Sequence, residues 1–241
     1  MARPPFPFAV LGLCVSGLTL HAQAPSPQLT QVYKAMDAAS KRFVNATANV
    51  ERQNYEKVVR DTTVEKGTMY IQRNGNSSEF GATVSPVDAQ GKPAPTPSRI
   101  LSYNNGTLQM YTPATKQVDL FKSGANQSKV EGYFALGFGG NSQALTQSWN
   151  VTDAGPETLT DNGQQVKTEK LVLTSKDPGV RNTFTQITLW LDPTRDVSLK
   201  QVFETPSGDR QTAIYTNIHL NGKLNTSAYK IPTKGVTVVP H

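Results

Sequence analysis

The chain has few side chains that could carry out acid–base, nucleophilic or metal chemistry. Its 241 residues include three histidines and one cysteine. His219 alternates with Ile218 and Leu220 in a strand-like run, so we expect its ring on the solvent face or at the end of a strand. A metal site needs several converging ligands, and the sequence supplies His219 with no such partners. The sequence therefore predicts no metal site.

Carboxylates alone could provide hydrolytic chemistry, since two acids suffice to hydrolyse a glycosidic bond. Four acids lie close together in the sequence, at Glu51, Glu56, Asp61 and Glu65. Strand and turn positions explain all four without catalysis. The sequence also contains no Gly-x-Ser-x-Gly or His-Glu-x-x-His motif. We therefore expect a protein that is not an enzyme and that binds no cofactor.

Arg73 is the polar side chain with the most specific candidate role. It ends a short strand, Gly67 to Arg73, in which Met69, Ile71 and Arg73 share one face because strand side chains alternate. A guanidinium group has a fixed fork of donors and can hold several carbonyl oxygens. The alternative is a solvated arginine at a strand end with no special role.

A hairpin follows that strand. Residues 100–111 contain two β-rich runs joined at Asn105-Gly106, which is the strongest short-range hairpin signal. A third run, residues 116–121, follows the turn at Thr112-Pro113. Before the hairpin, residues 85–97 contain four prolines and one glycine, which predicts an exposed loop. This loop could contact a partner or be an insertion without a role.

The first helix is predicted near the start of the mature chain. Ser26 is a good N-cap and Pro27 suits the first helical position. Residues at spacings of three and four then form one stripe: Leu29, Val32, Tyr33, Met36, Ser40 and Phe43. The stripe must be buried, either by packing on a sheet or by lining a ligand cavity.

A second helix is predicted from about residue 127 to 136, with Val130, Tyr133 and Phe134 on one side. It ends at Gly137–Gly140, where three glycines permit positive φ. A phosphate-binding loop would need a lysine and a preceding strand, which this segment lacks. We interpret it instead as a hinge, from which Phe138 can swing into or out of a cavity.

The remainder of the chain predicts an antiparallel sheet. Candidate strands are residues 148–153, 165–174, 183–191, 198–204, 210–220 and 228–231. Each gap carries turn residues, at Asp161-Asn-Gly163, Asp177-Pro-Gly179, Asp192-Pro193, Pro206–Asp209 and Asn221-Gly222. Connections this short join sequence neighbours, so we expect a meander and not a parallel, doubly wound sheet. From Ala46 to Val59 the composition also favours a strand.

Residues 1–24 are typical of an export signal. Arg3 supplies a positive start, residues 8–20 are mostly apolar, and Ala22-Gln-Ala24 fits a cleavage site. The lone Cys14 lies inside this segment and follows a poor lipid-attachment motif. Residues 25–241 then form one domain. The net charge of +6 is dispersed along the chain, which does not favour nucleic-acid binding.

Short motifs follow one another along the chain in a characteristic order. They are Gly67, Met69 and Arg73; Asn105-Gly106, Leu108 and Tyr111; Gln117-Val118; Leu189-Trp190-Leu191-Asp192; Val202-Phe203-Glu204; and Tyr229 to Pro232 with Gly235-Val236. In this order the chain resembles the LolA family of periplasmic carriers, which ferry lipoproteins to the outer membrane. The resemblance spans roughly Leu29 to Val239.

The resemblance implies an α+β fold: a half-open antiparallel β-barrel with short helices that close its mouth. It implies that Arg73 hydrogen-bonds to the helical lid in the closed state. It also implies an apolar cavity and lid, for which the candidate residues are Leu29, Val32, Met36, Met69, Ile71, Arg73, Leu108, Met110, Tyr133, Phe134, Phe138, Leu189 and Leu191.

An apolar cavity is needed to keep an acyl chain out of water during transport. Exposing one acyl chain of ~14 carbons to water costs on the order of 10 kcal/mol, at about 0.8 kcal/mol per methylene. The resemblance thus implies a monomeric periplasmic carrier of lipoprotein acyl chains, loaded by an inner-membrane ABC-type complex and unloaded by an outer-membrane acceptor. Two alternatives stay open: a carrier of free lipid or a stress-sensor domain with the same fold, and a structural β protein with a filled core.

Overall fold

The computed structural model describes residues 25–75, 77–124 and 136–241. The predicted export signal lies outside these residues, and so does the second helix up to residue 135. The first helix, α1 (Pro27–Ser40), begins as predicted: the Ser26 Oγ accepts a hydrogen bond from the Leu29 amide, and Pro27 opens the first turn. The predicted stripe is buried or half-buried along its length.

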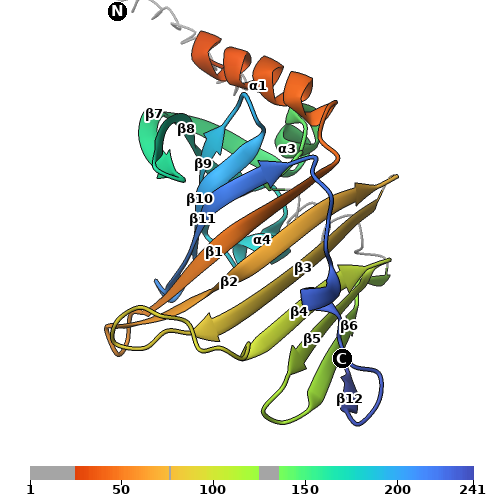
Figure 1. Cartoon of the computed structure of the whole chain (residues 1–241). Helices are drawn as coiled ribbons and strands as arrows, with labels where there is room; N and C mark the ends of the chain where they lie inside the picture. The colour runs from red at the N-terminus through yellow and green to blue at the C-terminus, as the bar shows by residue number, and fades with distance from the viewer. Residues whose placement is uncertain (1–24, 76, 125–135) are drawn as a thin grey trace, which may run out of the picture.

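The described residues form one twelve-stranded sheet (Figure 1). The strands are β1 Asn45–Glu56, β2 Asp61–Asn74, β3 Ser77–Pro86, β4 Arg99–Asn104, β5 Thr107–Thr112, β6 Gln117–Lys122, β7 Trp149–Asp161, β8 Gln164–Ser175, β9 Gln186–Asp192, β10 Val197–Glu204, β11 Arg210–Leu220 and β12 Thr237–Pro240. Short helical turns accompany them: α3 Ser142–Ser148, α4 Pro178–Arg181 and η2 Ser227–Tyr229. None of the helices in the described part of the chain is long and apolar enough to cross a membrane.

The sheet consists of two meanders. Strands β1 to β6 follow one another, strands β7 to β11 follow one another, and β1 pairs with β11 to join the two sets. Among the described strands, all pairs are antiparallel except β12 with β6. The order places β12 and β7 at the two edges, so the described strands form a curved, open sheet. This confirms the predicted fold class of a half-open barrel with few short helices.

Two tight turns confirm the sequence signals. Asn105 and Gly106 both have positive φ, at 47° and 71°, and join β4 to β5. Asn162 and Gly163 do the same between β7 and β8, at 49° and 77°. Positive φ at both central residues matches the right-handed twist of the strands, and Asn-Gly tolerates it at low cost.

Some boundaries were predicted wrongly. The segment at residues 228–231 is not a strand: Tyr229 belongs to η2 and packs on Tyr70, with ring centroids 4.9 Å apart. The last strand is β12, beyond Pro232. Residues 177–179 begin the short helix α4 and not a simple turn. Val58 and Val59 are exposed in the turn after β1.

Strand β3 was missing from the prediction because its sequence is polar and contains a glycine. The glycine is required there: a Cβ at Gly81 would lie 2.3 Å from the Tyr70 ring and 2.9 Å from the Tyr229 Cβ. The two tyrosines thus occupy the space where a side chain would stand. A glycine that weakens the strand signal here permits the packing of the C-terminal segment on the outer face of β2 and β3.

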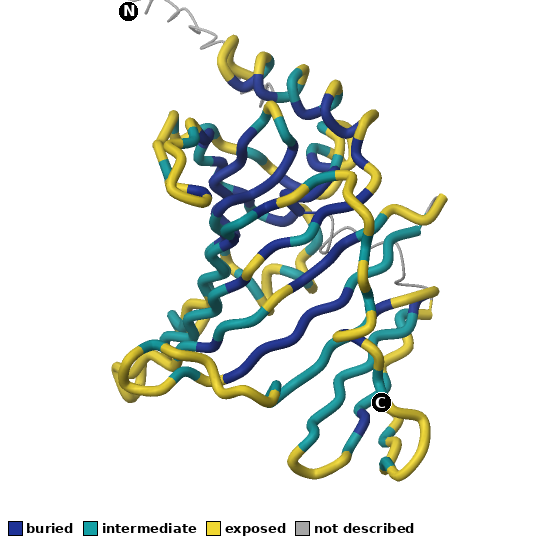
Figure 2. The backbone as a smooth tube through the Cα atoms, in the orientation of Figure 1, coloured by how far each residue is buried: buried dark blue, intermediate teal, exposed yellow. Residues whose placement is uncertain are grey.

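The inner face of the sheet carries two apolar clusters. One lies on β1 to β3, β10 and β11 and includes Ala46, Met69, Ile71 and Leu199. The other lies on β8 and β9 under α1 and α3, and its members are Leu29, Val32, Met36, Leu136, Leu145, Trp149, Leu171, Leu173, Ile187, Leu189 and Leu191. Figure 2 shows the buried backbone running along these strands and the side of α1 that faces them, with exposed hairpin tips. Helix α1 lies across one end of the sheet (Figure 1).

Candidate functional site

A cavity of about 610 Å³ lies on the inner face of the sheet, over β1 to β5, β10 and β11. Its lining is mostly apolar and consists of Val50, Arg52, Met69, Phe80, Ala82, Val84, Leu101, Leu108, Phe138, Phe184, Gln201, Phe203, Gln211, Thr212, Ala213 and Tyr215. Met69, Leu108 and Phe138 were predicted as cavity residues. We call this space the main cavity; its volume is in the range of small-molecule sites.

Strand register explains why these side chains converge. Met69 lies opposite Ala82, and Ala82 lies opposite Leu101 on the next strand. Directly opposed residues share one face of a sheet, so this row points inward together. Small side chains at Ala82 and Ala213 leave the volume that larger residues would occupy. The cavity therefore argues against the alternative of a filled interior.

A second cavity of about 390 Å³ lies between α1, α3 and strands β8 and β9. It is lined by Met36, Leu136, Gly137, Gly140, Asn141, Ala144, Leu145, Gln147, Ser148, Trp149, Leu171, Leu189 and Leu191. Met36, Leu189 and Leu191 were predicted as cavity residues. Among the described residues, these two apolar spaces have no lining residue in common.

The segment Leu136–Gly139 stands between the two cavities, and we call it the partition. Leu136 and Gly137 line the second cavity, whereas Phe138 lines the main cavity. Phe138 is buried and meets the Tyr215 ring edge-on, with centroids 4.9 Å apart. In this state the ring is held in the core; the swinging motion expected of it stays a prediction.

Backbone hydrogen bonds attach the partition to the start of β10. The Ser198 amide donates to the Gly137 carbonyl at 2.6 Å, and the Gly139 amide donates to the Asp196 carbonyl at 3.0 Å. Glycine is required at residue 139 for two reasons. Its φ is +72°, and a Cβ there would lie 2.3 Å from the Phe43 ring.

Arg73 connects helix α1 to the partition. Its Nη1 donates to the Ser40 carbonyl at 2.9 Å, and its Nη2 donates to the Ser40 Oγ at 3.3 Å and to the Gly139 carbonyl. The Ser40 Oγ itself donates to the same Gly139 carbonyl at 2.8 Å. The guanidinium also lies 5.7 Å from the centroid of the Phe43 ring. The predicted contact between Arg73 and a helix is therefore present, although the residue as a whole remains more than a third exposed.

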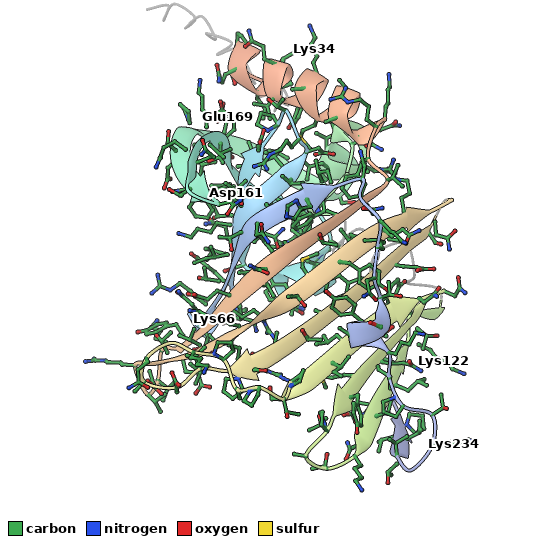
Figure 3. All side chains as sticks on the ribbon, in the orientation of Figure 1. Lys34, Lys66, Lys122, Asp161, Glu169 and Lys234 are labelled. Atoms are coloured by element: carbon green, nitrogen blue, oxygen red, sulfur yellow. The ribbon has the colours of Figure 1, made fainter. Side chains whose placement is uncertain are left out.

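Two further contacts hold α1, and the sequence did not reveal them. The Asp37 carboxylate accepts hydrogen bonds from the Ser142 amide and hydroxyl, both at 2.8 Å, at the start of α3. Near the other end of α1, Gln28 donates to Glu169 of β8 at 3.0 Å. Figure 3 labels Glu169 below the helix and Lys34 on its outer side. In the sequence, the polar residues beside the apolar stripe are the signal that could have indicated these contacts.

Asp196 is the unusual acid of this region. Its side chain is fully buried, and neither carboxylate oxygen has a hydrogen-bond partner among the described residues. Burial raises the pKa of Asp196 from 3.8 to about 7; Arg73 lowers it and Asp37 raises it further. The residue also has a φ of +57° in the turn between β9 and β10. The turn was predicted, but not this buried carboxyl.

The remaining predicted cavity residues lie elsewhere. Leu29, Val32 and Ile71 pack into the two apolar clusters. Met110 pairs with Leu101 across β4 and β5 but is absent from the lining of both cavities. The side chains of Tyr133 and Phe134 lie outside the described residues.

The structure also shows where the residues considered for metal binding and hydrolysis lie. His219 is exposed, with its Nε2 3.1 Å from the Asn217 side-chain oxygen. Within residues 25–75, 77–124 and 136–241, no group of three histidine, cysteine, aspartate or glutamate side chains is arranged to hold a metal ion. The four clustered acids lie on β1 and β2.

Comparison with solved structures supports the fold. A structure of MucB matches with a TM-score of 0.50 and 10% identity, over 88% of this chain and 66% of the MucB chain. At this identity the likeness shows a shared fold alone. The present chain corresponds to about two thirds of MucB, so the rest of MucB has no counterpart in the match.

Two other structures are similar at lower scores. An uncharacterized conserved protein from Thermus thermophilus has a TM-score of 0.49 and 12% identity, over 89% of this chain and 99% of that one. An outer membrane lipoprotein-sorting protein domain from Vibrio parahaemolyticus has a TM-score of 0.41 and 12% identity, over 84% and 94%. Comparisons of the sequence with protein-family models and with curated proteins find no match.

Proposed function

We propose that this chain, which has a LolA-like fold, is an exported carrier that holds acyl chains of lipoproteins and moves them from the inner to the outer membrane. The observation that supports this most directly is the main cavity, an apolar space of about 610 Å³ on the inner face of the sheet. The likeness to MucB supports the fold and leaves the cargo open.

The volume of the main cavity suits one acyl chain. A methylene group takes up about the volume of one water molecule in the liquid, roughly 30 Å³. The main cavity thus has room for roughly 20 methylenes and the second for roughly 13. Burial of a 14-carbon chain is worth on the order of 10 kcal/mol. This is enough to carry such a chain through water.

Release requires that the cavity open, and Arg73 is suited to control this step. A hydrogen bond from a charged donor contributes about 1.5–3 kcal/mol. Three such bonds from Arg73 are weaker in total than the burial of one acyl chain, so an entering chain can displace them. Helix α1 and the partition would then separate from Arg73 together, because the Ser40 and Gly139 carbonyls share its donors.

The proposed partners follow from this role. A carrier of this kind would receive its cargo from an inner-membrane release complex of the ABC type and deliver it to an outer-membrane acceptor. We propose a monomer in the periplasm, exported by the signal in residues 1–24.

Native mass spectrometry of the protein taken directly from its own periplasm tests the cargo. An acylated peptide bound at one copy per protein is the expected result, and an empty protein would contradict it. The variant Ala213→Phe places a ring in the main cavity, reduces its room and should abolish co-purified cargo. Ala114→Phe, in the exposed turn between β5 and β6, is the matched control and should keep its cargo.

A carrier of free lipid is the second candidate. The observation that favours it is that the main cavity holds about one chain and not several. Free lipid in the same mass spectrum, without any peptide, would select this candidate over the first.

A further inference from the structure

A polar recess borders one end of the main cavity, with which it shares two lining residues. This recess has a volume of about 460 Å³ and is lined by Arg52, Asn54, Tyr55, Glu56, Val58, Thr63, Arg99, Thr205, Asp209, Arg210 and Gln211. Arg52 and Gln211 line both spaces. An apolar compartment and a polar one therefore meet at these two side chains, near the start of β2, where Figure 3 labels the neighbouring Lys66.

The polar groups of the main cavity are distributed unevenly. Gln201 and Tyr215 are occupied with each other, since the Tyr215 hydroxyl donates to Gln201 at 3.1 Å. Gln201 in turn donates to the Leu136 carbonyl at 2.5 Å. Arg52 is the charged side chain in the lining of the main cavity. Among the described residues, a ligand with one polar end would thus meet a charged lining side chain at the junction with the recess.

Arg52 and Arg99 share a single carboxylate. Glu65 Oε1 accepts from Arg99 at 2.5 Å, and Glu65 Oε2 lies 3.5 Å from Arg52 Nη1. The glutamate side chain is 11% exposed, whereas the arginine side chains are 30% and 36% exposed. Two guanidinium groups around one carboxylate leave a net charge of +1. A guanidinium has five N–H donors, so donors remain on both arginines after Glu65 is satisfied.

The other charges of the recess lie farther from the junction. Arg210 stacks on Tyr55, with its Cζ 4.9 Å from the ring centroid. Asp209 accepts hydrogen bonds from Ser207 and from the Lys57 amide, and these bonds lower its pKa. Arg210 and Asp209 line the same recess, and their opposite charges offset each other. Glu56 adds a further negative charge to this lining. The positive charge is therefore concentrated at the arginine pair, where the apolar lining begins.

We infer that the main cavity also takes a second class of ligand, a single-chain amphiphile with an anionic head, a carboxylate or a phosphate, which Arg52 and Arg99 hold at the junction. The tail runs along the inner face past Met69 towards Leu108, and the head stays in the solvent-accessible recess. Arginine forks bind carboxylate and phosphate oxygens in a bidentate manner. The inference rests on the proposed acyl-chain cavity and adds the chemistry of the head group.

Two pairs of single-chain probes test this inference, and the two members of each pair differ in the head group. Palmitate and hexadecanol differ in the charge of the head; 1-palmitoyl lysophosphatidic acid and monopalmitoylglycerol differ in the phosphate. Dissociation constants are measured by displacement of a fluorescent fatty-acid analogue from the delipidated wild-type protein, at low and at moderate salt. We expect the anionic member of at least one pair to bind about 10-fold or more tightly, which one charge-assisted hydrogen bond can supply. The pair that shows the preference identifies carboxylate or phosphate as the head.

The variant Arg52→Gln should remove this preference, so that the affinity falls much more for the anionic member of the pair than for the neutral member; Glu65 keeps Arg99 as its partner. Arg210→Gln, in the same recess but away from the junction, is the matched control and should retain the preference. Equal affinities for both members of both pairs in the wild type would overturn the inference while the acyl-chain cavity stands. If no probe binds, the proposed function fails together with it. Retention of the preference in Arg52→Gln would also overturn the role of the arginine pair.

Discussion

Asp196 should make the protein less stable as the pH rises from about 4 to 8. Its carboxyl is fully buried and lacks a hydrogen-bond partner within the described residues. Burial raises its pKa from 3.8 to about 7, with Arg73 acting against this shift and Asp37 adding to it. The fold therefore favours the form of this carboxyl that carries its proton.

The sign of the effect follows from where this proton is bound. Between about pH 4 and 7 the folded protein keeps the proton on Asp196, whereas the unfolded chain, with an ordinary aspartate pKa of about 3.9, has lost it. Unfolding therefore releases a proton in this window, and the free energy of unfolding falls as the pH rises. A difference between 3.8 and about 7 corresponds to about 4 kcal/mol, fully lost above pH 7.

The substitution Asp196→Asn isolates this effect, because asparagine has the size of the acid and is neutral at every pH. Urea unfolding of wild type and variant between about pH 4.5 and 8.5 gives the two stability curves. We expect similar stabilities at about pH 4.5 and a variant more stable by up to about 4 kcal/mol at about pH 8.5. That is a large part of the roughly 5–15 kcal/mol typical of a domain.

Asp61→Asn, at an exposed position, serves as the control and should follow the wild-type curve. Parallel curves for wild type and Asp196→Asn would refute the reasoning. The reasoning would also be refuted if the free energy of unfolding rose between about pH 5 and 8 by the same amount in the wild type and in the variant.

Two further substitutions test the contacts between α1, Arg73 and the partition. Arg73→Leu should leave the protein folded but speed amide exchange in α1 and cargo release severalfold, because the bonds that oppose opening are lost, with Arg73→Lys intermediate because an ammonium lacks the fork; release at the wild-type rate would exclude a switching role. Gly139→Ala should cost more than about 3 kcal/mol, because positive φ and the clash with Phe43 add together. Gly155→Ala, with φ of +88° and open space around it, should cost only about 1 kcal/mol in thermal unfolding; equal costs would contradict the clash.

The local signals in the sequence were sufficient for most elements. Ser26 and Pro27 located the start of α1, and Asn105-Gly106 located a hairpin, because caps and tight turns depend on residues that are adjacent in the chain. The alternation in β2 placed Met69 and Arg73 on one face of the strand. Short connections then required sequence neighbours to pair, which led to the antiparallel sheet.

Contacts between distant residues were beyond the reach of the same reasoning. The pairing of β1 with β11, the glycine at residue 81 and the course of the chain after Tyr229 all depend on packing across the sheet. For the site, periodicity identified inward-facing residues but could not distinguish packed core from cavity lining. Leu29 and Met69 both lie on apolar faces that periodicity predicts, yet Leu29 packs in the cluster between α1 and the sheet, whereas Met69 lines the main cavity.

The energies at the mouth also explain how a carrier can bind tightly and still release its cargo. The acyl chain supplies the affinity through burial, which depends little on which membrane or partner is nearby. The contacts of α1 are fewer and weaker, and they join one helix end to the partition through shared acceptors. A partner that competes for the Ser40 and Gly139 carbonyls thus needs only a few kcal/mol to release the Arg73 end of α1, while the bonds of Asp37 and Gln28 and the apolar stripe still hold the rest of the helix. The free energy needed to move the helix is then separate from the free energy of exposing the acyl chain to water. The receiving membrane offsets the second cost, because it buries the acyl chain again.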